Sequence, residues 1–164
     1  MHIAQKDRKR AVNLLEQELG WISDNGKLNP RFLESIVEFF RVYADRTHHG
    51  KEEDILFKEL SRKSISGEHK RTMDELKDDH VRGRELIKQI SDILENRDED
   101  NAKNLDTVAE AIKGLLALYP QHIEKEDKHL TLIFKLKNQE SVFHFTNFSG
   151  YPLDTILKMV GTKI

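Results

Sequence analysis

The chain has 164 residues, a length typical of one compact domain. Its 27 Lys and Arg residues nearly balance its 29 Asp and Glu residues, so the formal net charge is −2. This balance argues against a nucleic-acid-binding protein, which needs a basic face. The absence of cysteine excludes disulfides, thiolate metal sites, iron–sulfur clusters and cysteine nucleophiles. Any bound metal must therefore be held by histidine and carboxylate side chains, and eight histidines are available.

The N-terminus and the apolar content predict a cytoplasmic protein. Residues 6–10 are all charged and no long apolar run follows them, unlike a secretory signal. No stretch approaches the ~20 apolar residues of a membrane-spanning helix. Glycine-rich phosphate-binding loops, the serine-hydrolase pattern and HExxH are also missing from the sequence. We therefore expect a protein that binds neither membranes nor nucleic acids.

Apolar residues recur at helical spacing in four long segments. Helices are predicted at about residues 3–23, 30–61, 68–95 and 105–136. The second begins with a good N-cap, Asn29, followed by Pro30, which suits the first helical position. Four amphipathic helices joined by short polar links predict an all-α, up-down-up-down four-helix bundle.

The composition changes after residue 136. Only five of the last 28 residues are charged, and the run SVFHFTNFSGY at 141–151 is rich in aromatic residues. We therefore expect the bundle to occupy residues 1–136, and a C-terminal tail of undetermined structure to occupy residues 137–164. This aromatic tail either packs across the bundle or contacts a protein partner.

Three histidines are followed four residues later by a glutamate. A helix places such residues on the same face, so each pair offers two metal ligands one turn apart. The pairs are His48/Glu52, His49/Glu53 and His122/Glu126. Helical spacing puts His49 and Glu53 on the more polar side of the second helix, where they would be further ligands or would orient the ligands.

Three of the predicted helices each point one histidine at the core. His48, His80 and His122 lie on the apolar stripes of the second, third and fourth helices, and two glutamates share those stripes. Burying an ionised carboxylate without a partner costs several kcal/mol. Two carboxylates that converge in a bundle core therefore indicate a cation between them. The predicted metal ligands are His48, Glu52, His80, His122 and Glu126.

The run FFRVYADRTHHGKEEDILF, from Phe39 to Phe57, resembles the signature of the haemerythrin-like HHE cation-binding domains. LKDDHVRGRELI around His80 and HIEKED at residues 122–127 extend the similarity, which covers about residues 30–136. The resemblance implies a four-helix bundle with a non-haem iron centre, usually of two irons. Carboxylates bridge the irons in this family, and one position stays open for dioxygen or a related small ligand. It implies the same five ligands, with His49 in the place of a further one.

The first helix departs from the family pattern. The family normally supplies a histidine from this helix, whereas the core stripe here is apolar from Ala11 to Leu19. His2 and Asp7 are the nearest candidates. Either one of them serves as a ligand, or one iron has lost a ligand.

Two glycines lie near the histidines inside the predicted helices, where glycine costs roughly 1 kcal/mol relative to alanine. Gly83 follows His80 by one turn, and Gly114 precedes His122 by two turns. They either leave room for a metal and a small ligand or allow two helices to approach closely.

Three functions fit this pattern. The favoured one is a non-enzymatic protein that binds iron, two ions per chain or alternatively one iron or zinc, for dioxygen binding, sensing or iron handling. The second is a non-haem iron enzyme that acts on peroxide or nitric oxide in stress defence. The third is an interaction module with structural zinc or no metal. The sequence does not separate the first two, because both need an open iron site.

Overall fold

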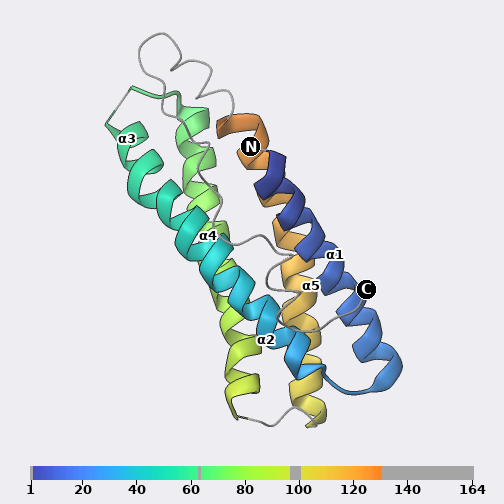
Figure 1. Ribbon diagram of the computed structural model, residues 1–164. Helices are drawn as coiled ribbons and strands as arrows, with labels where there is room; N and C mark the ends of the chain where they lie inside the picture. Colours follow the sequence, from blue (N-terminus) through green and yellow to red (C-terminus); the bar gives the residue numbers. More distant parts are fainter. Residues whose placement is uncertain (1, 63, 97–100, 131–164) are drawn as a thin grey trace.

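The computed structural model describes the backbone of residues 2–62, 64–96 and 101–130, and the side chains of residues 9–128 within those ranges. These residues form four long helices that alternate in direction, with no strand among them (Figure 1). The predicted all-α, up-down-up-down bundle is confirmed. No helix in the described ranges combines the length and the apolar composition needed to cross a membrane.

The helices start and end close to the predicted positions. The first is α1 (His2–Asn25), and the second is a continuous series of α2 (Pro30–Phe39), η1 (Phe40–His49), η2 (Glu52–Phe57) and α3 (Lys58–Ser61). The third is α4 (Gly67–Asn96), and the fourth is α5 (Ala102–Lys125), continued by η3 (Glu126–Leu130). Asn29 caps α2 as predicted, because its side-chain oxygen accepts a hydrogen bond from the backbone N–H of Phe32. Residues 131–136 of the predicted fourth helix lie outside the described residues.

The second long helix changes its geometry where the histidines lie. Both η1 and η2 are π-helical, with wider turns closed by bonds between residues five apart. The backbone N–H of Gly50 donates to the carbonyl of Asp45, and the hydroxyl of Thr47 donates to the carbonyl of Val42. A π-turn holds more residues than an α-turn, so it shifts which side chains face the core.

The buried apolar side chains form two separate clusters. The larger contains residues from all four long helices, including Leu15, Leu33, Ile36, Ile90, Ile112 and Leu115. The smaller consists of Leu56, Phe57, Leu60, Met73 and Leu76. Along α4, His80 stands between Leu76 of the smaller cluster and Ile87 of the larger. A buried polar layer, made of His49, Glu52, His80, His122 and Glu126, therefore lies between the two clusters along the bundle.

Helix packing accounts for one of the two glycines. α4 packs against α5, and a Cβ atom at Gly114 of α5 would lie 2.9 Å from Cδ2 of Leu86 on α4. Side-chain atoms do not approach so closely, so a larger residue at this position would force Leu86 to move. Gly114 thus serves the close approach of two helices rather than space for a ligand.

Candidate metal centre

Three buried histidines from three helices meet in the polar layer. His49 of η1, His80 of α4 and His122 of α5 each offer a ring nitrogen, and these nitrogens all lie within 4.8 Å of one another. The rings of His49 and His80 stack with centroids 3.8 Å apart, and His122 meets His80 edge-on at 5.0 Å. Each of the three residues is at most 3% exposed. We term them the three-histidine group.

A second set of donors lies beside it. His48, Glu52 and Glu126 also place one donor atom each within 4.8 Å of the others, and we term them the His48 group. Oε1 of Glu52 lies 3.5 Å from Nε2 of His48, and Oε2 lies 3.4 Å from Nε2 of His80. Oε1 of Glu126 lies 3.0 Å from Nε2 of His48 and 2.8 Å from Nε2 of His122. Each carboxylate therefore stands between His48 and one member of the three-histidine group.

The structure corrects the placement of His49. α-Helical spacing assigned it to the more polar side of the second helix, but it is 3% exposed and faces the interior. The reason is the π-helical geometry of η1, whose wider turns bring the neighbouring His48 and His49 both toward the layer. The side chain of His48 is the more accessible of the two, at 15% exposed.

Each member of the three-histidine group has a carboxylate at its Nδ1 atom. The pairs are His49 with Asp45 at 3.5 Å, His80 with Glu53 at 2.8 Å and His122 with Asp79 at 3.4 Å. Of the three contacts, that of His80 with Glu53 is a hydrogen bond, whereas Asp45 and Asp79 lie near Nδ1 of His49 and His122 without forming one. A carboxylate near one ring nitrogen favours a ring orientation that leaves the other nitrogen for a metal. Glu53 thus stands in the orienting place, and outside both donor groups.

Cationic side chains hold these carboxylates in turn. Arg84 donates from Nε to Asp45 and from Nη2 to Glu53, each at 2.7 Å. Lys125 donates to Asp79 at 2.9 Å. Unlike Glu53, four of these residues were not predicted from the sequence: Asp45, Asp79, Arg84 and Lys125. Asp45 carried a usable signal, since it precedes His49 by four residues, whereas Asp79 and Lys125 come together from two different helices.

The protonation of the histidines follows from these neighbours. Burial lowers the pKa of His49 to about 3, so its ring is neutral at pH 7 and offers a lone pair. Burial acts in the same direction on His122, but the carboxylates of Asp79 and Glu126 outweigh it and raise its pKa to about 9. His122 therefore carries a proton that a bound cation would displace.

Several polar atoms in the layer have no hydrogen bond. Both ring nitrogens of His49 and of His122, Nε2 of His80 and Oε2 of Glu52 are buried and form none within the part of the chain that the structure describes. A buried polar atom without a partner costs about 1–3 kcal/mol. A cation among these atoms would satisfy the nitrogen lone pairs and neutralise the carboxylates. The donor set therefore fits a metal ion.

A cleft leads from the surface to this layer. It has a volume of about 470 Å³, lies between η1 and α4, and includes His49, Gly83 and Tyr119 in its lining. A Cβ atom at Gly83 would lie 3.5 Å from the hydroxyl oxygen of Tyr119. Cδ2 of Leu118, also on α5, would lie 3.6 Å away, and both are ordinary contact distances, so the two interpretations of Gly83 stay open.

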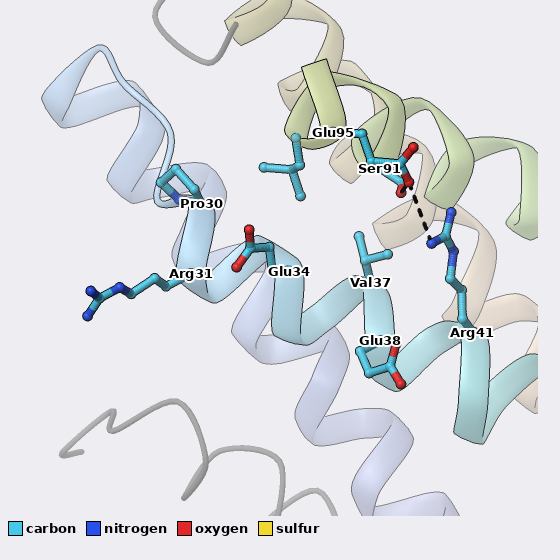
Figure 2. A pocket seen from close by; sticks show the side chains of 9 residues that line it. Pro30, Arg31, Glu34, Val37, Glu38, Arg41, Ser91 and Glu95 are labelled. Carbon is cyan, nitrogen blue, oxygen red and sulfur yellow. Dashed lines mark hydrogen bonds and ion pairs between the residues drawn. The ribbon is translucent and has the colours of Figure 1, made fainter. Parts of the chain in front are cut away.

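A larger cavity, of about 950 Å³, lies between α2 and the last turns of α4 (Figure 2). Its lining contains no histidine. The side chain of Arg41 reaches across it to Glu95, with the charged atoms 3.9 Å apart. This cavity offers carboxylates and arginines that are mostly paired or solvated, and it does not share the donor set of the polar layer.

The contribution of the first helix stays a prediction. The side chains of His2 and Asp7 lie outside the described ones. Among the described side chains of α1, those of Ala11 and Leu15 are buried, and neither has an atom that could bind a metal. The buried Glu18 accepts a hydrogen bond from the backbone N–H of Asn29, at the turn between α1 and α2.

Comparison with known proteins places the chain in a family. The sequence model of the Hemerythrin HHE cation binding domain matches residues 5–131, which is most of the chain. The chain therefore belongs to this family, as the motifs around His48, His80 and His122 indicated, and the match also includes most of α1. Searches of curated proteins and of solved structures gave no match. The expected boundary at residue 137 lies beyond both the match and the described residues, and stays a prediction.

Proposed function

We propose that this member of the haemerythrin HHE family holds a non-haem iron centre, with up to two irons per chain, and that it binds dioxygen or another small diatomic ligand there. The observation that carries the proposal is the buried polar layer, in which three imidazoles and two carboxylates face one another between two apolar clusters, with His48 beside them. Mixed imidazole and carboxylate donors suit iron, while zinc accepts the same donors.

The residues have distinct roles in this proposal. The three-histidine group holds one ion and His48 holds the other. Glu52 and Glu126 would help to hold both ions, because each carboxylate stands between His48 and one of the three histidines. Bound ferrous iron supplies an open coordination position and a change of oxidation state. The chain supplies the orientation of the rings through Asp45, Glu53 and Asp79.

The cleft at His49 supports binding of a small ligand. It gives a route from solvent toward the centre, with the apolar side chains of Phe40, Ile87 and Tyr119 and charged side chains, among them Asp45 and Arg84, in its lining. Gly83→Leu should slow ligand binding through this cleft without changing the metal content. Gly20→Leu, at a position where nothing lies within 4 Å, is the matched control.

The test starts from metal-free protein, to which excess ferrous iron is added anaerobically before air or azide is admitted. We expect ultraviolet–visible charge-transfer bands that appear with iron and change with oxygen or azide. The Glu52→Ala, Glu126→Ala variant should lose them. Reversible oxygenation identifies a carrier or sensor, and turnover of peroxide or nitric oxide identifies an enzyme instead. Bound iron that responds to none of these molecules would contradict the proposal.

A further inference from the structure

Three segments of the described chain are π-helical, and each of them carries donors of the proposed metal centre. η1 ends with His48 and His49, η2 begins with Glu52, and η3 begins with Glu126. π-Helical turns are rare in proteins and frequently occur at functional sites. The coincidence of these wide turns with the donors indicates that the turns serve the placement of the donor side chains.

The two histidines of η1 are neighbours in the chain but belong to different donor groups. His49 is part of the three-histidine group and its neighbour is part of the His48 group, with the two ring centroids 5.6 Å apart. Because a π-turn holds more residues than an α-turn, consecutive side chains are separated by a smaller angle about the helix axis. An α-helical turn at this place would rotate the two rings farther apart, so that one of them would turn away from the layer.

The residue before this pair makes a hydrogen bond that suits the wide turn. The hydroxyl of Thr47 donates to the carbonyl oxygen of Val42, five residues earlier, at 2.8 Å. In an α-helix, a threonine hydroxyl reaches the carbonyl three or four residues earlier. The backbone N–H of Gly50 likewise donates five residues back, to the carbonyl of Asp45. The hydroxyl bond of Thr47 therefore stabilises the π-helical register over the α-helical one.

We propose that Thr47 is a positioning residue, whose hydroxyl holds η1 in the π-helical register and thereby turns both neighbouring histidines toward the metal. This inference rests on the proposed metal centre, and Thr47 acts on it through His48 and His49. If the hydroxyl is removed, part of the chains adopt the α-helical register. The apparent affinity for a metal then falls in proportion to the fraction of chains that keep the competent one.

Two substitutions of Thr47 separate the hydroxyl from the shape of the side chain. Thr47→Val keeps the shape and removes the hydroxyl, whereas Thr47→Ser keeps the hydroxyl. Zn²⁺, which does not change its oxidation state, is titrated into each metal-free full-length chain against a chelator of known affinity. Thr47→Val should bind Zn²⁺ about tenfold more weakly, a change of about 1.4 kcal/mol and of the order of one intramolecular hydrogen bond. Thr47→Ser should stay within about twofold of the unchanged chain.

Thr107 of α5 provides the matched control. Its hydroxyl donates to the carbonyl of Lys103, four residues earlier, in an ordinary α-helical turn. Thr107→Val loses the same group and should leave the Zn²⁺ affinity unchanged. The visible spectrum of the Co²⁺-loaded chain, which reports the ligands and geometry around the ion, should change in Thr47→Val alone among the three variants. A general loss of stability would not produce such a change.

Nuclear magnetic resonance couplings across hydrogen bonds test the register without any metal. In the unchanged metal-free chain, the amide nitrogen of Gly50 should couple to the carbonyl carbon of Asp45. In Thr47→Val, a coupling of Gly50 to the carbonyl carbon of Arg46, its partner in an α-helix, should appear. The measurement on the unchanged chain needs no variant, so it tests the register even if Thr47→Val does not fold.

The outcomes separate this inference from the proposed function. A Gly50 amide that couples to Arg46 in the unchanged chain would overturn the inference and leave the iron proposal standing. The same holds if Thr47→Val binds Zn²⁺ as tightly as Thr107→Val, or if Thr47→Ser loses as much affinity as Thr47→Val. A chain that gives the expected Zn²⁺ affinities and couplings but takes up no iron would support the inference and overturn the iron proposal.

Discussion

Leu33 and Leu115 of the larger apolar cluster are as deeply buried as His49, His80 and His122 of the polar layer. Burial of each leucine stabilises the fold by about 1.5–3 kcal/mol through the hydrophobic effect alone. Burial of the histidines instead leaves ring nitrogens without hydrogen bonds, beside two carboxylates in a low-dielectric interior. One part of the core is therefore complete with the chain itself, whereas a cation at the proposed metal centre would stabilise the other.

Removal of the metal should change the unfolding free energy more than any of the substitutions that follow. A ligand that binds only the folded chain stabilises it by about 4 kcal/mol when its free concentration is 1,000 times its dissociation constant. Metal-loaded protein should therefore unfold at higher denaturant concentration than chelator-treated protein, and calorimetry should show a raised melting temperature. Identical unfolding curves with and without metal would show that the polar layer is stable by itself.

A cavity made in the larger apolar cluster should lower the unfolding free energy by the same amount with and without bound metal. Leu33→Ala removes a fully buried side chain and should cost about 3 kcal/mol of unfolding free energy, in metal-loaded and metal-free protein alike. Val81→Ala, at a position that is 51% exposed, should change stability by less than about 0.5 kcal/mol. Denaturant titration of both variants in both states gives the four values. A Leu33→Ala cost that depended on metal would mean that the two parts of the core are coupled.

Arg84 tests whether residues outside the donor groups set the affinity. It holds both Asp45 and Glu53, which face Nδ1 of His49 and His80. Arg84→Gln should weaken metal binding at the three-histidine group about 10- to 100-fold, because the rings lose their fixed orientation. Arg82→Gln, on the exposed side of the same helix, is the control. If the two variants bind Zn²⁺ with equal affinity, Arg84 does not influence metal binding.

Glu18 lies apart from the metal centre and should have the smallest effect. Burial raises the pKa of this carboxyl from 4.5 to about 7, although the hydrogen bond from Asn29 opposes the shift. The folded protein therefore favours the protonated form, and stability should fall as the pH rises from about 4.5 through 7. Glu18→Gln should recover about 1 kcal/mol at pH 8, after a discount for solvent screening, and nothing at pH 4.

The matched control for Glu18 is Glu16→Gln, which changes an exposed carboxylate of the same helix. Its unfolding free energy should follow that of the unchanged chain at both pH values. If the unfolding free energy of Glu18→Gln follows that of Glu16→Gln across the pH range, burial does not raise the pKa of Glu18.

The sequence predicted those features that depend on neighbouring residues in the chain. The capping of α2 by Asn29 and the helix bounds follow from local signals. The apolar stripes predicted that His48, His80 and His122 face the core; the structure groups His80 and His122 with His49, and His48 lies with Glu52 and Glu126. His49 was misplaced because α-helical spacing does not apply in a π-helical segment. The pairing of Asp79 with His122 depends on how α4 packs against α5, which no local spacing encodes.

If the polar layer holds iron, untagged protein purified from iron-replete cells should contain at least one iron per chain by elemental analysis. A Glu52→Ala, Glu126→Ala variant, purified in parallel and shown to be folded, should have lost most of that iron. A folded chain that is free of iron and unable to take it up would show that the layer is no iron site. A double variant that keeps its full iron content would show that the iron is held elsewhere.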